Sequence, residues 1–314
     1  MTAPDPASLL TPPGVRGRAW PHLVVGGVSL CALLALVDDL SRREVVTLFK
    51  VTAESERVEL TVEAGGTDPI RLSGASVQDD CRTLAGVTGD LRLADGVRVV
   101  LTRIGEDPVL TLVAEAPEGG SSVGMLQPDG GAPVELQGGA AITLPLAASD
   151  ATPARRASLH FAARDVRIGA RWRPGTAGAT QPLLRSGRVS LIGLAQGDVP
   201  FEAQSFELGP YETITDFPDP RPPAEQPLWW GTVTAEAGTG MRTTFAVMDT
   251  RIALWRGSVP YRLGVTVFDH LRGHPRFALF CAVFVILALI AVSLVSHALR
   301  NAIDRRATTV FTRI

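Results

Sequence analysis

The chain has 314 residues, of which 46% are hydrophobic and 20% are charged, and its formal net charge is −2. This composition excludes a chain that is disordered throughout. The near-neutral charge also argues against a nucleic-acid partner, because proteins that bind nucleic acids present a basic face. Lys50 is the only lysine and Asn301 the only asparagine, a bias that we interpret as the mark of a GC-rich bacterial genome.

The first predicted element is a transmembrane helix over residues 19–37, which carry no charged side chain and follow an N-terminal tail of residues 1–18. Arg16 and Arg18 would also suit a cleaved signal peptide or a lipoprotein signal. A lipoprotein signal needs a small residue before the cysteine, but Leu30 precedes Cys31. The residues after Leu36 fit a signal-peptidase site poorly, so the sequence favours a retained helix.

Small residues recur at four-residue steps in this helix, at Gly27, Cys31 and Ala35. Such a stripe lets a neighbouring helix approach closely in a membrane. Ala278 and Ala282 repeat the step near the other end of the chain. We therefore expect these five residues to form helix-packing interfaces.

The middle of the chain, residues 38–276, changes to a period of two. The segment from Arg57 to Glu63 alternates polar and apolar side chains, which is typical of a strand with one buried face. Turn clusters rich in glycine and proline separate further segments of this kind. The most regular of these segments are 97–103, 109–114, 157–161, 165–172, 188–194, 229–234, 242–247, 251–255 and 262–267.

Short strands at this spacing predict an antiparallel, sandwich-like β domain, with a solenoid as the second choice. The composition changes from glycine-rich and acidic to arginine-rich near residues 147–153. The β region could divide there into two subdomains or form one extended β structure. Chain length is only a soft guide, so both alternatives stay open.

A proline-rich segment and a pair of tryptophans stand out in the second half of this region. Prolines alternate with other residues from Pro218 to Pro222, which predicts a rigid, extended arm. Trp229 and Trp230 follow, and neighbouring strand residues point to opposite faces. We expect one tryptophan to be buried and the other to contact a partner; the candidate partner-contact residues are Pro218, Pro220, Pro222, Trp229 and Trp230.

Residues 277–299 form the second predicted transmembrane helix. They are free of formal charge and bracketed by Arg276 and Arg300. At about 1.5 Å per residue, this segment spans a hydrocarbon core of about 30 Å. A tail of residues 300–314 follows.

The charges predict the orientation of the two helices. The two tails hold six arginines and two aspartates, a net charge of +4, so the middle carries −6 of the chain's total of −2. Positive segments stay on the cytoplasmic side. Both termini are therefore expected in the cytoplasm and residues 38–276 in the periplasm, across a bacterial inner membrane.

Catalytic and metal-binding motifs are weak or absent. There is no G-x-S-x-G sequence, and the three cysteines are too far apart for a zinc site. His22 and His297 lie near the same predicted membrane face, where ligation of a haem or pigment is a minor alternative to simple solvation. Three acidic pairs would suit a glycosidase, although spacing alone does not place their carboxylates: Asp79 with Asp80, Glu202 with Glu207, and Asp216 with Asp219. We predict no catalytic residue, no metal and no cofactor.

The sequence thus predicts a non-catalytic accessory or scaffold subunit of a larger membrane complex, with the lipid bilayer and other integral membrane subunits as its partners. Respiratory, photosynthetic, transport and secretion complexes fit equally. The second hypothesis is an extracytoplasmic module that binds or transfers an envelope lipid or polysaccharide. A hydrolase that no motif reveals is the third.

Overall fold

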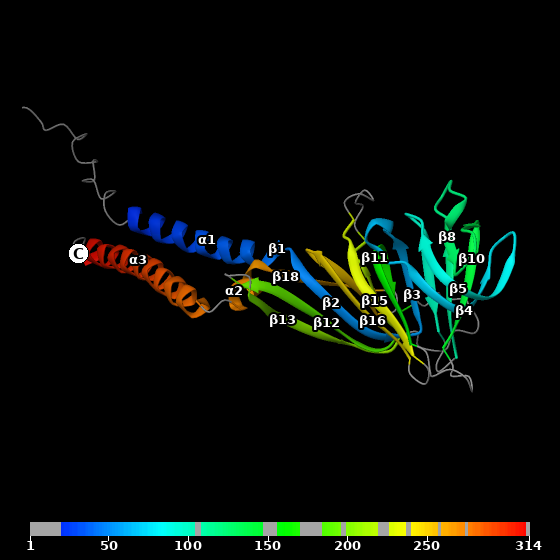
Figure 1. Ribbon diagram of the computed structural model, residues 1–314. Helices are drawn as coiled ribbons and strands as arrows, with labels where there is room; N and C mark the ends of the chain where they lie inside the picture. Colours follow the sequence, from blue (N-terminus) through cyan, green and yellow to red (C-terminus); the bar gives the residue numbers. More distant parts are fainter. Residues whose placement is uncertain are drawn as a thin grey trace, which may run out of the picture. The chain divides into compact units, whose positions relative to one another are not determined.

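The computed structural model describes residues 20–103, 108–146, 156–169, 184–195, 199–218, 226–236, 240–256, 259–273 and 276–311. By its internal contacts the chain divides into a helical unit, residues 1–43 and 266–314, and a β unit, Glu44–Val265 (Figure 1). Several predicted features lie outside the described residues: the tail of residues 1–18, the boundary at 147–153, and Pro220 and Pro222.

The described residues of the helical unit form three helices, α1 (Trp20–Arg42), α2 (Val267–Gly273) and α3 (Phe277–Phe311). Within α1 and α3, the segments Val24–Arg42 and Phe277–His297 are long and apolar enough to cross a membrane, by length and composition. Helix α1 continues beyond the predicted end at residue 37. Salt bridges at i,i+4 support this last turn, from Arg42 to Asp38 and from Arg43 to Asp39. Helix α3 likewise continues beyond residue 299.

Helix α2 begins with a capping box that the sequence analysis did not identify. The Asp269 carboxylate accepts hydrogen bonds from the Thr266 backbone N–H and hydroxyl, and the Asp269 N–H donates to the Thr266 hydroxyl. The Val267 N–H also donates to the Arg43 carbonyl at 2.8 Å. The end of α1 and the start of α2 are therefore held together.

The β unit is built from eighteen described strands. The first nine are β1 (Glu44–Val45), β2 (Thr47–Ser55), β3 (Arg57–Val62), β4 (Ile70–Gln78), β5 (Thr83–Leu93), β6 (Arg98–Thr102), β7 (Val109–Glu115), β8 (Ser122–Pro128) and β9 (Val134–Gln137). The other nine are β10 (Gly139–Pro145), β11 (Arg156–Ile168), β12 (Leu184–Ala195), β13 (Val199–Leu208), β14 (Glu212–Asp216), β15 (Trp229–Glu236), β16 (Met241–Asp249), β17 (Arg251–Arg256) and β18 (Val259–Thr266). A 3-10 turn, Ala64–Gly66, follows β3.

These strands join into one hydrogen-bonded sheet that branches at β11. One arm runs β11–β15–β16–β2–β12–β13, the second runs β11–β3–β6–β7–β10–β4–β5–β8–β9, and the third runs β11–β14–β17–β18–β1. Each pairing whose register is defined is antiparallel, which confirms the predicted antiparallel β fold between two apolar helices. The solenoid alternative is wrong, because strands distant in sequence pair directly, as β2 does with β12 and β16.

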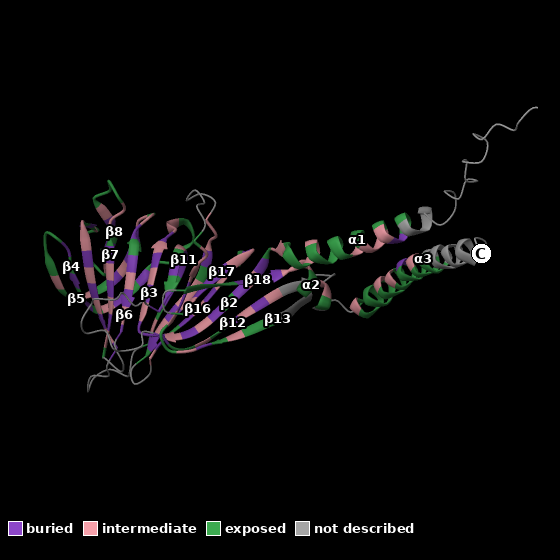
Figure 2. Cartoon of the chain, turned by 180° about the vertical axis from the view of Figure 1, so that it is seen from behind, coloured by how far each residue is buried: buried purple, intermediate pink, exposed green. Residues whose placement is uncertain are grey.

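The core of the β unit follows from strand alternation. In β2 the side chains of Phe49, Val51 and Ala53 are buried, while Lys50 between them is exposed. Figure 2 shows the same alternation of buried and exposed positions along many strands. One continuous cluster of buried apolar side chains extends along the sequence from Phe49 to Val265. The β unit thus has a complete apolar core of its own.

Candidate functional site

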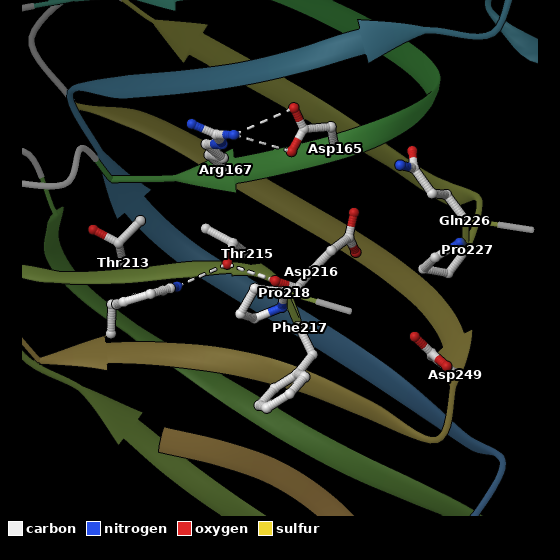
Figure 3. A pocket seen from close by; sticks show the side chains of 11 residues that line it. Asp165, Arg167, Thr213, Thr215, Asp216, Phe217, Pro218, Gln226, Pro227 and Asp249 are labelled. Atoms are coloured by element: carbon white, nitrogen blue, oxygen red, sulfur yellow. Dashed lines mark hydrogen bonds and ion pairs between the residues drawn. The ribbon is translucent and has the colours of Figure 1, made fainter. Parts of the chain in front are cut away.

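A cavity of about 260 Å³ opens in the β unit beside strand β14. Its walls combine acidic, basic, amide, hydroxyl and aromatic side chains, which Figure 3 shows arranged around the end of β14. Convergent polar groups of this kind mark a candidate binding site. The lining residues are Asp165, Arg167, Thr213, Thr215, Asp216, Phe217, Pro218, Gln226, Pro227, Asp249 and Trp255.

Asp216, the last residue of β14, occupies the most unusual electrostatic environment in this cavity. Burial raises the pKa of its carboxyl group to about 7, and the nearby charges of Asp165 and Asp249 act in the same direction. The Trp229 indole N–H donates a hydrogen bond of 2.6 Å to the carboxyl group, which partly opposes this increase in pKa. Asp216 is therefore a half-buried acid that changes its charge near neutral pH.

Asp165 enters the cavity from an irregular position in β11. Its backbone φ is 48°, and the pairing of β11 with β3 shifts register between Arg164 and Arg167. A bulge of this kind redirects side chains, and aspartate adopts positive φ more readily than most residues. The Arg167 guanidinium then lies 3.3 Å from the Asp165 carboxylate. The bulge thus places an acid and a base together at the cavity.

Two aromatic side chains, together with Pro218 and Pro227, form the apolar part of the wall. The Trp255 indole N–H donates to the Thr215 hydroxyl at 2.9 Å, which holds the indole ring against β14. The Arg251 guanidinium lies 4.6 Å from the centroid of the Phe217 ring, a cation–π contact. Both rings therefore have fixed orientations.

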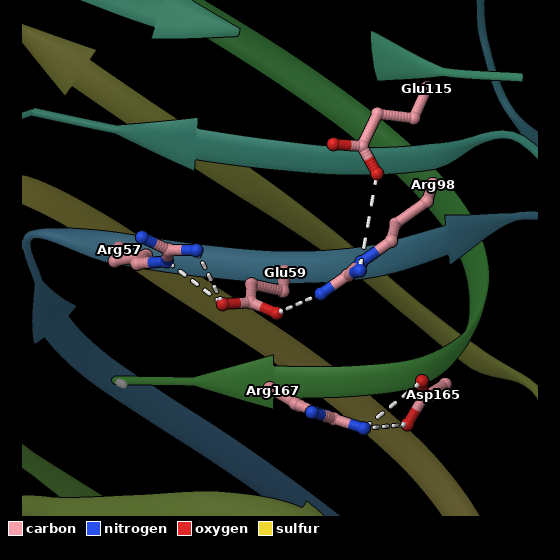
Figure 4. Close-up of polar contacts among 6 residues, drawn as sticks. All are labelled: Arg57, Glu59, Arg98, Glu115, Asp165 and Arg167. Carbon is pink, nitrogen blue, oxygen red and sulfur yellow. Dashed lines mark hydrogen bonds and ion pairs between the residues drawn. The ribbon is translucent and has the colours of Figure 1, made fainter. Parts of the chain in front are cut away.

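A charged network covers the neighbouring strands β3, β6 and β7 (Figure 4). Glu59 lies at its centre and receives hydrogen bonds from Arg57 at 2.8 Å and from Arg98 at 2.9 Å. Burial alone would raise the pKa of Glu59, but the two arginines hold it below its ordinary value. Glu115, at the edge of the network, lies 3.9 Å from Arg98.

Because Glu59 is held by two close arginines and Glu115 lies at the edge of the network, replacing each by glutamine should change the free energy of unfolding by different amounts. Glu59→Gln should lower the free energy of unfolding by about 1 kcal/mol at neutral pH, because it weakens two charge-assisted hydrogen bonds. Glu115→Gln, at an exposed and distant contact, should change it by less than about 0.5 kcal/mol. Urea unfolding of the two variants checks this. The effect of Glu59→Gln should shrink as the pH falls through the lowered pKa of Glu59; equal effects of both variants would contradict the assignment.

The structure separates the two tryptophans that the sequence analysis singled out. Trp229 is 0% exposed and bonded to Asp216, whereas Trp230 is 50% exposed. Pro218 is exposed and lines the cavity. Trp229 therefore belongs to the core, and Trp230 is the tryptophan that is available to a partner.

Trp230 belongs to an apolar surface of the sheet, which we call the Trp230 face. Trp230 of β15 pairs with Ala246 of β16. Met248, two residues further along β16, is 54% exposed and pairs with Leu48 of β2. Leu48 in turn pairs with Ile192 of β12. Alternation along each strand places all five side chains on the outward side across β15, β16, β2 and β12, and the exposed Lys50, which pairs with Ala246, lies among them. The Trp230 face is therefore apolar around one lysine.

The predicted helix-packing residues lie on the outer surface of the helical unit. Cys31, Ala35, Ala278 and Ala282 are exposed, and a Cβ atom added to Gly27 would meet nothing within 4 Å. Close contact between α1 and α3 occurs instead at the preceding residue.

Gly26 is the buried glycine of α1. A Cβ atom added there would lie 2.8 Å from Val295 Cγ2 and 3.0 Å from the Ala291 carbonyl oxygen. The small-residue contact within the chain therefore joins Gly26 to α3, and the predicted stripe at Gly27 faces away from it.

The acidic pairs were considered as the two carboxylates of a glycosidase, but Asp79 has a structural contact instead. The Asp79 carboxylate is buried and accepts the backbone N–H groups of Cys81 and Arg82, so it stabilises a turn. Asp216 is described above, and Asp219 lies outside the described residues.

Side chains that could bind a metal ion or a haem are not brought together in the part of the chain that the structure describes. That part contains no group of three or more His, Cys, Asp or Glu side chains that could hold a metal ion. His297 is exposed, and the side chain of His22 lies outside the described residues. Cys31, Cys81 and Cys281 are exposed and free.

Comparisons with protein-family models, with curated proteins and with solved structures found no match.

Proposed function

We propose that this chain is a two-pass protein of a bacterial inner membrane whose β unit lies in the periplasm and serves as a non-catalytic accessory subunit of a larger membrane complex. The Trp230 face is the observation that carries the proposal. A surface that exposes the large apolar side chains of Trp230 and Met248 beside Lys50 is the kind of surface that contacts another protein. It lies on a β unit whose core is already complete, so the fold does not need it.

The helical unit supports the membrane part of this proposal. Large apolar side chains are exposed along both helices, among them Val28, Leu34, Leu279 and Leu289. Such surfaces are stable in lipid or against other apolar helices. The arginine-rich tails, with a net charge of +4, favour a cytoplasmic position for both termini.

Two surface substitutions test the proposed partner contacts. Trp230→Ser should reduce the partners that co-purify after gentle detergent extraction by about fivefold or more, because it removes the centre of the Trp230 face. Gly27→Leu should have a similar effect if a partner helix packs on the outer stripe of α1. Quantitative mass spectrometry of the extracted complex measures both losses.

Each variant has a matched control. Met125→Ser changes another exposed apolar residue of the β unit, and Val28→Leu enlarges an exposed residue of α1 outside the stripe. Both should keep the wild-type partners and membrane abundance. If Trp230→Ser and Gly27→Leu also retain every partner, the accessory-subunit proposal fails.

The second candidate function is an extracytoplasmic module that binds or transfers an envelope lipid or polysaccharide. The cavity beside β14 favours it, since this role requires a pocket with converging polar groups.

A further inference from the structure

We propose that the cavity beside β14 binds one saccharide ring, stacked on Trp255 and held by hydrogen bonds to Asp165, Arg167 and Gln226. This inference rests on the second candidate function and narrows it from a lipid or polysaccharide to a carbohydrate. It does not depend on the accessory-subunit proposal, whose contact surface lies elsewhere on the β unit.

The size and lining of the cavity select the class of ligand. Pockets for drug-sized molecules measure about 300–1,000 Å³, so a cavity of about 260 Å³ accepts a single small ring and its substituents. Eight of its eleven lining residues carry a charged, hydroxyl or amide side chain, or the indole N–H of a tryptophan. Most of these groups already have hydrogen-bond partners within the protein, so an acyl chain would cover them without adding a polar contact, whereas the hydroxyls of a saccharide ring can add to the existing contacts.

Trp255 supplies a stacking surface. A saccharide ring presents C–H groups on its faces and hydroxyl groups at its edge, so its face packs on an aromatic ring while the hydroxyls stay free for polar contacts. The indole of Trp255 is held in place by its hydrogen bond to Thr215. An already oriented ring loses little conformational entropy when a ligand binds.

The polar groups supply both donors and acceptors. Asp165 and Asp249 offer carboxylate oxygens, whereas Arg167 and Gln226 offer N–H groups (Figure 3). Each sugar hydroxyl can donate and accept, and two adjacent hydroxyls match the two oxygens of a carboxylate or the two N–H groups of a guanidinium. This mixture suits a neutral polyhydroxylated ligand.

The charges of the cavity argue against a cation. Arg167 lies against Asp165, and the Trp229 indole N–H already occupies one oxygen of Asp216. The Asp249 carboxylate accepts the Thr250 backbone N–H at 2.6 Å, so all three acidic side chains are engaged within the protein. A metal ion or an amine would compete with these contacts, while a hydroxyl can add to them.

The test uses the full chain in lipid nanodiscs, because detergents with sugar headgroups would occupy the site. Glucose, galactose, N-acetylglucosamine and their short oligomers are titrated separately, and intrinsic tryptophan fluorescence and calorimetry follow binding. At least one of these sugars should bind saturably below about 10 mM, a concentration typical of weak single-ring binding. Trp255→Ala and Arg167→Gln should each weaken that binding about tenfold or more, whereas Trp230→Ala should not change it.

Several outcomes would overturn the proposal. These are the absence of saturable binding by every sugar, unchanged binding in both Trp255→Ala and Arg167→Gln, and saturable binding of spermidine or calcium in place of a sugar. Gln226→Ala, at an edge of the cavity, provides a further variant if Trp255→Ala does not fold. Loss of partners by Trp230→Ser is measured separately, so failure of the sugar site and failure of the accessory-subunit proposal are distinguishable.

Discussion

Trp229→Ala should lower the free energy of unfolding of the β unit by about 3–5 kcal/mol, the range for removing a large aromatic side chain from a packed core. Trp229 is fully buried, and its indole N–H bonds to the half-buried carboxyl group of Asp216. The substitution therefore leaves a large void and also removes a hydrogen bond. Urea unfolding of the full chain in detergent, followed by far-ultraviolet circular dichroism, measures the change.

The adjacent tryptophan provides the control. Trp230 points outward, so Trp230→Ala should change the same free energy by no more than about 0.5 kcal/mol. A large loss of stability in Trp230→Ala, or a small one in Trp229→Ala, would contradict the assignment of the two faces of β15.

Asp216→Asn should stabilise the protein at pH 8 and do so much less at pH 4. Burial raises the pKa of Asp216 from 3.8 to about 7, so the folded state binds the proton more tightly than the unfolded state does. The stability of the wild type therefore falls relative to that of the variant as the pH rises from about 4 to about 7. At about 1.4 kcal/mol per pKa unit, the upper limit of the gain above pH 7 is about 4 kcal/mol. Asparagine keeps the oxygen that accepts the Trp229 hydrogen bond.

The measurement is the difference in free energy of unfolding between wild type and Asp216→Asn across this pH range. The difference should grow with pH and become constant above about pH 7. A difference that is the same at pH 4 and pH 8, or that grows toward low pH, would show that Asp216 is not a half-buried acid with a raised pKa.

Much of the fold could be predicted because its pattern is local. The two long helices contain continuous apolar segments, and strands such as β3 and β16 alternate cleanly between buried and more accessible residues. Strands β4 and β5 were missed, since their glycines and register shifts interrupt the alternation. The bulge at Asp165 joins two predicted strands, 157–161 and 165–172, into the single strand β11.

The cavity could not be predicted in the same way. Asp165, Asp216 and Asp249 lie far apart in the sequence, and only the pairing of β11 with β14 and of β14 with β17 brings their segments together. The sequence analysis did single out Asp216, but as one member of a pair with Asp219. Helix α1 contacts α3 at Gly26, next to the predicted Gly27. The spacing of small residues did not reveal which side of α1 faces α3.

We propose that two membrane helices hold the β unit outside the cytoplasm. The accessibility of native Cys81 tests this position of the β unit most directly. Cys81 is exposed in the β unit, and Cys31 and Cys281 can be replaced by serine so that it is the only thiol. In intact spheroplasts, a membrane-impermeant maleimide should label Cys81, while a cysteine introduced by Arg313→Cys should react only after the membrane is permeabilised. Protection of Cys81 until lysis, or labelling of position 313 in intact cells, would contradict the account.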